Sequence, residues 1–175
     1  MKVKGDHRTG PETARLRLRA FEPKDAEAFY RLNSDPAVMQ HTGEPPCESI
    51  EVATAAIRAY PDWQLYGIGR WAAISKETDE VVGFAGLKYL ADLDEVDLGY
   101  RFVPECWGRG LATEAATACL KYGLETLGLE RIIGITLPAN HASMRVLEKV
   151  GMTREKTFLY DGEPVELYVK LVTRE

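Results

Sequence analysis

The spacing of apolar side chains predicts a strand followed by two helices in the first third of the chain. Residues 13–20 alternate Leu or Ala with Arg, which is the period of a half-buried strand. A helix is expected from Pro23 to an Asp-Pro pair at 35–36, where proline disfavours helical backbone. A loop rich in Gly and Pro at 40–47 separates it from a second helix at 49–60.

The middle of the chain predicts three strands, a glycine-containing loop and a long helix. Strands are expected at residues 69–75, 81–90 and 96–103, with polar turns between them. The loop 104–110 leads directly into a helix at 111–127, where apolar residues recur at the spacing of one buried face.

The last third predicts a strand, a short helix and a hairpin. A wholly apolar run at 132–137 indicates a strand that is buried on both faces. Residues 143–150 form a helix that stops at a glycine, and the alternating segments 157–160 and 165–171 flank an Asp-Gly turn.

This order of elements indicates a mixed α+β fold with one sheet in one domain. The length of 175 residues suits a single core, so we expect a domain over residues 13–175 and a flexible N-terminus over residues 1–12. The chain is 45% apolar and 28% charged, the balance of a globular protein, and it has no apolar run long enough to span a bilayer. The start shows no signal-peptide pattern, which predicts a cytoplasmic protein.

Cysteine, histidine and charge usage narrow the function classes. The cysteines and histidines are scattered singly, and they are Cys47, Cys106, Cys119, His7, His41 and His141. This spacing favours neither a disulfide framework nor a zinc site, so no metal is predicted. The net charge is −5 with the two signs mixed, which argues against a nucleic-acid binder and slightly favours a cationic substrate such as an amine.

The segment 96–114 carries the clearest chemistry. A strand runs into a loop that holds Gly108 and Gly110, and a helix begins at once. Glycines let backbone N–H groups approach an anion, and the helix N-terminus adds partial positive charge, so the pattern predicts a phosphate cradle. A tight turn that binds nothing stays open as the alternative.

Two nucleotide-binding motifs fit this loop poorly. A P-loop needs Gly-Lys-Ser/Thr, which does not follow here. A dinucleotide fingerprint is nearly matched, with Thr113 in the third glycine position and Glu130 twenty residues after Gly110. However, the preceding strands are expected to form an antiparallel meander and not βαβ units.

Residues 104–115 resemble motif A of the GCN5-related N-acetyltransferase (GNAT) family, and more narrowly its RimJ/RimL-like branch, which acetylates ribosomal-protein N-termini. Residues 140–152 resemble motif B of that branch, 32–39 its N-terminal helix and 160–162 its closing hairpin. The resemblance runs in order from about Leu16 to Leu171.

The chain departs from the family pattern at two positions. Trp107 stands where motif A begins with Gln or Arg, a variation that the RimJ/RimL branch also shows. Leu147 stands where many members place the tyrosine that protonates the leaving thiolate, so that phenol is missing here.

The resemblance implies a central, mostly antiparallel, splayed sheet of six to seven strands, flanked by about four helices. It implies acetyl-CoA as cosubstrate, held by backbone groups of Phe102 and Val103 along the pantetheine arm. The N–H groups of the cradle would hold the pyrophosphate, and these residues are Gly108, Arg109, Gly110, Leu111, Ala112 and Thr113.

The resemblance also implies a direct attack of an amine on the thioester. Asp97 would accept the amine proton through water, or is a solvated strand carboxylate. Asn140 would bond to pantetheine, and Ser143 would hold a water or protonate the sulfur, unless both are helix caps. His41 and Glu44 would form an acceptor wall if they are not merely surface residues.

The acceptor is expected to be a small-molecule amine or a protein N-terminus. Tyr160 and Tyr168 are alternatives to the missing tyrosine, although packing roles are favoured for both. A non-catalytic acyl-CoA-binding module and, more weakly, a dinucleotide-binding domain remain as other functions. A homodimer is left open, and neither nucleic acid nor membrane is expected as a partner.

Overall fold

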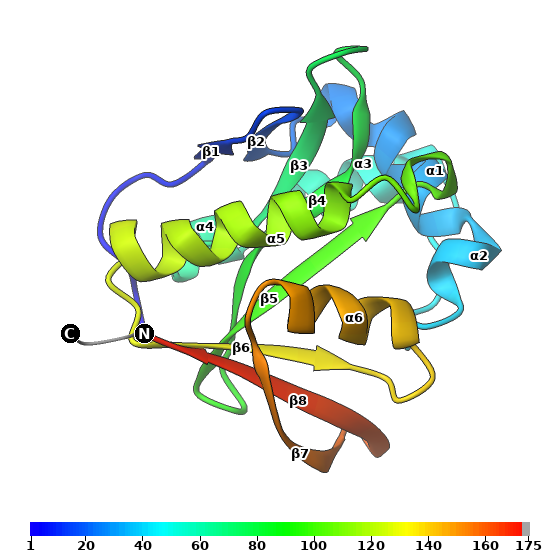
Figure 1. Ribbon diagram of the computed structural model, residues 1–175. Helices are drawn as coiled ribbons and strands as arrows, with labels where there is room; N and C mark the ends of the chain where they lie inside the picture. The colour runs from blue at the N-terminus through cyan, green and yellow to red at the C-terminus, as the bar shows by residue number, and fades with distance from the viewer. Residues whose placement is uncertain (173–175) are drawn as a thin grey trace.

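The computed structural model describes residues 1–172, and its centre is one eight-stranded sheet (Figure 1). The strands lie in the order β1-β2-β3-β4-β5-β6-β8-β7, and every neighbouring pair is antiparallel except β5 and β6. Their bounds are β1 (Thr9–Glu12), β2 (Leu16–Ala20), β3 (Arg70–Ser75), β4 (Val81–Leu90), β5 (Glu95–Phe102), β6 (Arg131–Thr136), β7 (Thr153–Tyr160) and β8 (Glu163–Leu171).

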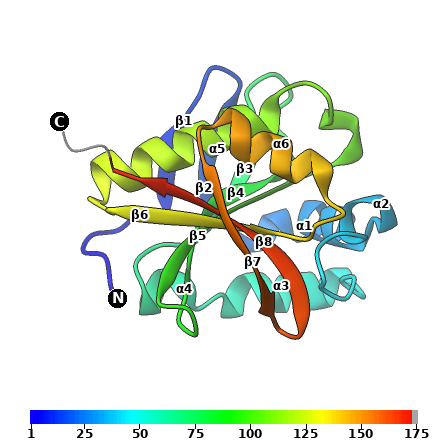
Figure 2. The same cartoon turned by 60° about the horizontal axis from the view of Figure 1, so that its bottom comes forward.

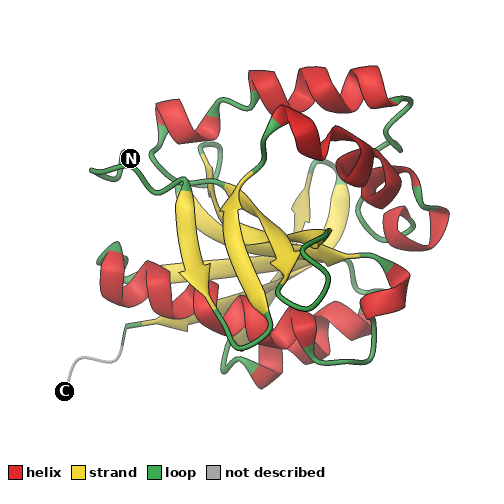
Figure 3. Ribbon diagram, turned by 90° about the horizontal axis from the view of Figure 1, so that it is seen from above, coloured by secondary structure: helices red, strands yellow, loops and turns green. Residues whose placement is uncertain are grey.

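Helices cover both faces of this sheet (Figures 2 and 3). One face carries α5 (Leu111–Lys121) and α6 (His141–Lys149), and α5 continues as a turn of π-helix at Tyr122–Thr126. The other face carries α1 (Ala26–Ser34), α2 (Pro36–Met39), α3 (Ile50–Ala59) and α4 (Asp62–Leu65). Short 3₁₀ turns at Pro23–Asp25 and Pro104–Cys106 precede α1 and α5.

The sheet opens between its two parallel strands. β4 and β5 pair over eight positions, whereas β5 and β6 share one register pair, Asp97 with Ile133. Beyond that pair the two strands diverge (Figure 1). The divergence leaves backbone groups at the end of β5 without a strand partner on that side, which is the splay that the family resemblance implies.

The mixed, mostly antiparallel fold class is confirmed, with differences in detail. The sequence predicts six to seven strands and a flexible segment up to residue 12, but the structure adds β1 at Thr9–Glu12, paired with β2. The sequence does not predict this strand because Gly10 and Pro11 are residue types that are uncommon in strands. A Cβ at Gly10 would lie 2.8 Å from the Trp71 ring, so the absence of a side chain lets the strand pack closely.

The core lies between the sheet and the helices on either side. Trp71 and Leu87 come from the sheet, while Ala115 and Cys119 come from the apolar face of α5, and all four are fully buried. None of the helices within residues 1–172 is both long and apolar enough to cross a membrane. Residues 173–175 of the expected domain lie outside the described part of the chain.

Candidate active site

A cleft of about 1480 Å³ runs along the opening in the sheet. It is lined by the start of α5, with Gly108, Gly110 and Thr113. It is also lined by the loop after α2, residues 40–48, and by the β7–β8 hairpin. The sequence-predicted residues Asp97, Phe102, Asn140 and Ser143 line it as well.

The glycine loop has the geometry of an anion cradle. Gly108 and Gly110 have φ angles of +71° and +77°, in the left-handed region that favours glycine. A Cβ at Gly108 would meet no described atom within 4 Å, and one at Gly110 would meet only an arginine nitrogen at 3.6 Å. Gly110 is the N-cap of α5 and has no side chain to cap the first N–H groups of the helix. These N–H groups and the open space beside them suit a pyrophosphate.

Two residues that sequence reasoning missed hold this loop in place. Arg15 donates from Nη1 to the backbone carbonyl of Arg109 at 2.9 Å and forms an ion pair of 2.6 Å with Glu114. The Glu114 carboxylate also accepts from the Thr13 hydroxyl at 2.6 Å and from the Arg15 backbone N–H at 2.9 Å. Burial opposes ionisation of Glu114, but these hydrogen bonds outweigh it and lower the pKa of the carboxyl. The turn between β1 and β2 therefore fixes the first turn of α5.

Two residues of the predicted cofactor site, Arg109 and Val103, do not line the cleft. The Arg109 side chain lines a smaller cavity beside the β3–β4 turn, where its Nη2 lies 3.8 Å from a carboxylate oxygen of Glu77. Val103 donates its N–H to Val82 at 3.0 Å, and its carbonyl accepts from Cys106 at 3.0 Å. Val103 therefore has no free N–H to offer to pantetheine. Of the two residues predicted to contact the pantetheine arm, only Phe102 remains a candidate.

Phe102 is the last residue of β5 and lines the cleft. Its carbonyl accepts from the indole Nε1 of Trp107 at 2.8 Å. This bond gives Trp107 a local role at the position where the sequence departs from motif A, because it ties the loop to the end of the strand.

Asp97 lies in the splay, and its carboxylate is engaged on both oxygens. Oδ2 accepts from Nη2 of Arg70 at 2.6 Å, and Oδ1 accepts from the backbone N–H of Ile135 at 3.1 Å. Burial raises the pKa of Asp97, with the Arg70 guanidinium acting in the opposite direction. The solvated carboxylate considered as an alternative is therefore wrong, because Asp97 is buried and ion-paired.

Asn140 and Ser143 open helix α6. The side-chain oxygen of Asn140 accepts from the Ser143 N–H at 3.1 Å, so Asn140 is the N-cap and its amide nitrogen remains as the group that could meet pantetheine. The Ser143 hydroxyl lies 3.1 Å from the phenol oxygen of Tyr100 on β5. Tyr100 was missed by sequence reasoning because an aromatic residue on a strand reads as core.

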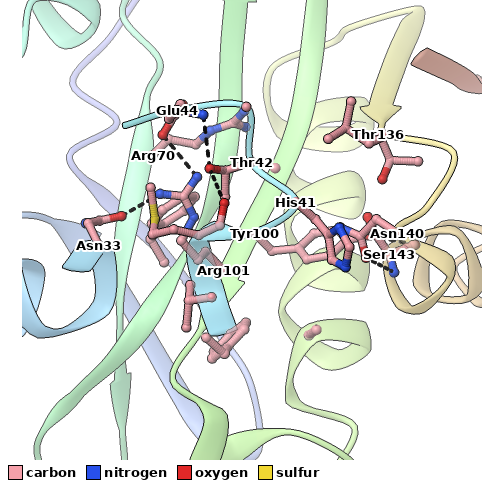
Figure 4. Close-up of a pocket in the computed structure, with 18 of the residues that line it drawn as sticks. Asn33, His41, Thr42, Glu44, Arg70, Tyr100, Arg101, Thr136, Asn140 and Ser143 are labelled. Carbon is pink, nitrogen blue, oxygen red and sulfur yellow. Dashed lines mark hydrogen bonds and ion pairs between the residues drawn. The ribbon is translucent and has the colours of Figure 1, made fainter. Parts of the chain in front are cut away.

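Charged side chains from β5 and from the loop after α2 meet in the cleft (Figure 4). Arg101 donates from Nη2 to Glu44 at 3.1 Å, also bonds to the Asn33 side chain, and lies over the Phe84 ring. Glu44 is 63% exposed while Arg101 is 13% exposed, so a nearly buried cation holds a loop carboxylate at the mouth. His41 lines the cleft on the same loop.

Comparison with known proteins decides the family. Residues 15–153 match the acetyltransferase (GNAT) domain. The chain belongs to the GNAT family. It is 34% identical over 172 residues to the uncharacterized N-acetyltransferase YoaA of Bacillus subtilis (strain 168), covering 93% of this chain and 96% of that protein.

Solved structures agree with this assignment. A GNAT-family acetyltransferase from Bacillus anthracis matches with a TM-score of 0.77 at 31% identity, over 98% of each chain. The spermidine N-acetyltransferase from Vibrio cholerae, in complex with CoA and spermine, shares the fold with a TM-score of 0.73 at 21% identity, over 89% of this chain and 95% of that one. This GNAT protein is an acetyl-CoA-dependent N-acetyltransferase.

The tyrosine that many GNAT enzymes place on the helix after the splay is replaced by Leu147, which is buried. Tyr168 is also buried, and its hydroxyl donates to Glu148 at 3.2 Å. Tyr160 lines the cleft, with its hydroxyl 3.5 Å from Asp92. No three His, Cys, Asp or Glu side chains within residues 1–172 gather closely enough to hold a metal ion.

Proposed function

We propose that this enzyme acetylates the primary amine of a small molecule or a protein N-terminus by direct attack in a ternary complex. The observation that carries the proposal is the continuity of the cleft. It joins the anion cradle at the start of α5 to the charged mouth at residues 40–48, through the opening between β5 and β6. An acetyl donor held at the cradle and an amine held at residues 40–48 would therefore share one cleft.

Acetyl-CoA supplies an activated acetyl group, and the chain supplies binding and orientation. The cradle N–H groups would hold the pyrophosphate, while the end of β5 at Phe102 and the Asn140 amide would line the pantetheine arm. Placing the amine and the thioester together removes much of the entropic barrier. The amine nitrogen then bonds to the acetyl carbon, the carbon–sulfur bond breaks, and the sulfur leaves with the electron pair.

The amine must lose a proton before it attacks, because an alkyl amine has a pKa near ~10 and a protein N-terminus one near ~8. Asp97 remains our candidate base, acting through water. Its buried position supports this role, since a raised pKa makes a carboxylate a stronger base. The ion pair with Arg70 weighs against it, and the alternative is that Asp97 holds the strands in place.

The acceptor class rests on the family motifs and on charge. The motifs at residues 104–115 and 140–152 resemble the RimJ/RimL-like branch, which supports a protein N-terminus, and the net charge of −5 suits either cationic acceptor. Glu44 lines the cleft, where Arg101 holds its carboxylate, and it would face a cationic amine. His41 would complete that wall.

A screen of amines and N-terminal peptides that follows release of the free thiol tests this function. We expect thiol release that depends on both acetyl-CoA and one acceptor class. The alternative, a non-catalytic acyl-CoA-binding module, is favoured by Leu147 and would bind CoA without releasing thiol. Thermal-shift titration should show stabilisation by CoA and acetyl-CoA but not by NAD or ATP, and equal stabilisation by NAD would contradict the proposal.

A further inference from the structure

Tyr100 and Ser143 form a pair of hydroxyl groups across the opening of the sheet. Tyr100 belongs to β5 and Ser143 to the first turn of α6, on the far side of the splay. The Tyr100 phenol lies 3.1 Å from the Ser143 hydroxyl and donates to the Ser143 backbone carbonyl at 3.0 Å. Both residues line the cleft, and the tyrosine side chain extends toward α6 (Figure 4).

We infer that Tyr100 is a positioning residue that turns the Ser143 hydroxyl proton into the cleft, toward the sulfur of the departing coenzyme A thiolate. The inference rests on the proposed function and names a residue that the family motifs do not supply. It requires no proton transfer from the phenol, because a hydrogen bond from Ser143 is sufficient to stabilise the developing negative charge on sulfur.

The donor count of the two hydroxyl groups allows this direction. A serine hydroxyl has one proton and two lone pairs, so it can accept from one group while it donates to another. The phenol also has only one proton, and a three-centre bond can share it between the Ser143 carbonyl at 3.0 Å and the Ser143 hydroxyl oxygen at 3.1 Å. In that arrangement the serine proton is free for the cleft. If the phenol were ionised, it could only accept, and the serine proton would be drawn to it.

The surroundings keep the phenol protonated. Tyr100 is largely buried, and burial raises its pKa well above the ordinary value for tyrosine. The charge of Asp97 on the same strand and the ring of Tyr168 on β8 act in the same direction, while the bond to Ser143 opposes them. At neutral pH the phenol is therefore protonated and a poor acid.

The residue one turn after Ser143 on α6 offers no hydroxyl. Leu147 is on the same helix face as Ser143 because the two are four residues apart, and it is buried. Tyr100 contacts the same helix from β5, across the opening of the sheet, so it is the phenol that the structure brings to Ser143.

The experiment compares Tyr100→Phe, Ser143→Ala, the double variant and Tyr122→Phe. Tyr122 is a matched control, since its phenol bonds to His7 at 2.8 Å and does not line the cleft. The primary readout is the pKa of the CoA thiol in the binary complex, followed by the ultraviolet absorbance of the thiolate. Free thiols of this kind have a pKa of roughly 8.5. Steady-state kcat, KM and the Kd of CoA complete the set.

In the wild type the bound thiol should have a pKa below the free value. We expect Tyr100→Phe and Ser143→Ala each to raise it by about one unit and to lower kcat by roughly tenfold, the effect of one hydrogen bond to a charged group. The double variant should be no worse than Ser143→Ala, the Kd of CoA should change little, and Ser143→Thr should restore the thiol pKa because it keeps the hydroxyl.

The inference is overturned if Tyr100→Phe leaves the thiol pKa and kcat unchanged, or if the two substitutions have additive effects. Its failure is distinct from failure of the proposed function. Full acetylation of an amine by Tyr100→Phe removes the inference alone. A wild type that shows the thiol pKa shift but acetylates no amine removes the function alone, and a wild type that does not bind CoA removes both.

Discussion

Arg70 on β3 and Asp97 on β5 form an ion pair across the intervening strand β4, with Arg70 Nη2 2.6 Å from Asp97 Oδ2. The same guanidinium donates from Nη1 to the backbone carbonyls of Gly86 and Asp97. A Cβ at Gly99 would lie 2.4 Å from this guanidinium, so only glycine leaves room for it. Because Asp97 also accepts from Ile135 on β6, one carboxylate holds the strands together where the sheet opens.

Replacing Asp97 with Asn tests a structural role through stability and a catalytic role through the pH dependence of kcat. Loss of one partner from a mostly buried pair should lower the free energy of unfolding by about 3 kcal/mol, measured by chemical denaturation. If Asp97 is the base, kcat should also fall by roughly ten- to a hundredfold at neutral pH. That loss should shrink at alkaline pH, where more of the amine is already neutral.

Replacing Arg70 with Met is the matched test, since it keeps the carboxylate and removes its counter-charge. The pKa of Asp97, already raised by burial, should rise further, so a basic Asp97 would stay protonated to higher pH. The acid limb of the kcat–pH profile should then move upward while the alkaline rate is retained. A profile that keeps its shape in both variants would assign Asp97 a structural role only.

Gly110→Asp should abolish useful CoA binding without unfolding the protein. The carboxylate would face the pyrophosphate, and like charges in a binding site cost several kcal/mol, so the affinity should fall by roughly a hundredfold or more. Gly110→Ala is the control, because it carries the strain of the φ angle of +77° without the charge. Calorimetric titration beside a circular-dichroism melt makes the comparison, and similar affinities in the two variants would place the phosphates elsewhere.

Glu114→Gln should lower stability at neutral pH and not in acid. Since the folded-state pKa of Glu114 is lowered, its stabilisation is present above the unfolded value near ~4.3 and is lost as pH falls through the folded value. We expect a deficit of about 1 kcal/mol at pH ~7, because Arg15 is 44% exposed and solvent weakens the pair. Melts of the wild type and the variant should converge once the pH is below the folded-state pKa of Glu114.

The control for Glu114 is Glu77→Gln, which removes a surface ion pair to Arg109 of 3.8 Å. Its melting temperature should equal that of the wild type at every pH, because exposed pairs contribute little. A constant gap between Glu114→Gln and the wild type down to acid pH would show that the carboxylate charge is not what stabilises the loop.

Glu44→Gln should raise the KM of a cationic acceptor by roughly tenfold, the effect of one charged hydrogen bond. The Kd of CoA should stay the same because Glu44 bonds to Arg101 and belongs to the loop after α2, not to the cradle. Glu51→Gln on α3, an exposed carboxylate that does not line the cleft, serves as the control. Equal KM values for all three proteins would exclude Glu44 from acceptor binding.

The sequence by itself predicted seven of the eight strands, the four longer helices and the glycine loop before α5, but not the four-residue helices α2 and α4. These are local properties of the sequence. Apolar periodicity indicates a helix or a strand, and the glycines before α5 indicate a loop with positive φ angles. β1 was missed because Gly10 and Pro11 lack a strand pattern, and its pairing with β2 comes from packing against Trp71. The helix limits were right to within a few residues for the same local reason.

Only the tertiary structure decided which groups meet in the cleft. Arg70 and Asp97 are 27 residues apart, Tyr100 and Ser143 are 43 apart, and Arg15 and Glu114 are 99 apart. Sequence periodicity reports which face of an element is buried, but the partner of a side chain depends on how strands are ordered and where the sheet opens. For the same reason the N–H of Val103, which is adjacent to Phe102 in the chain, donates to Val82 on β4 and does not face the cleft.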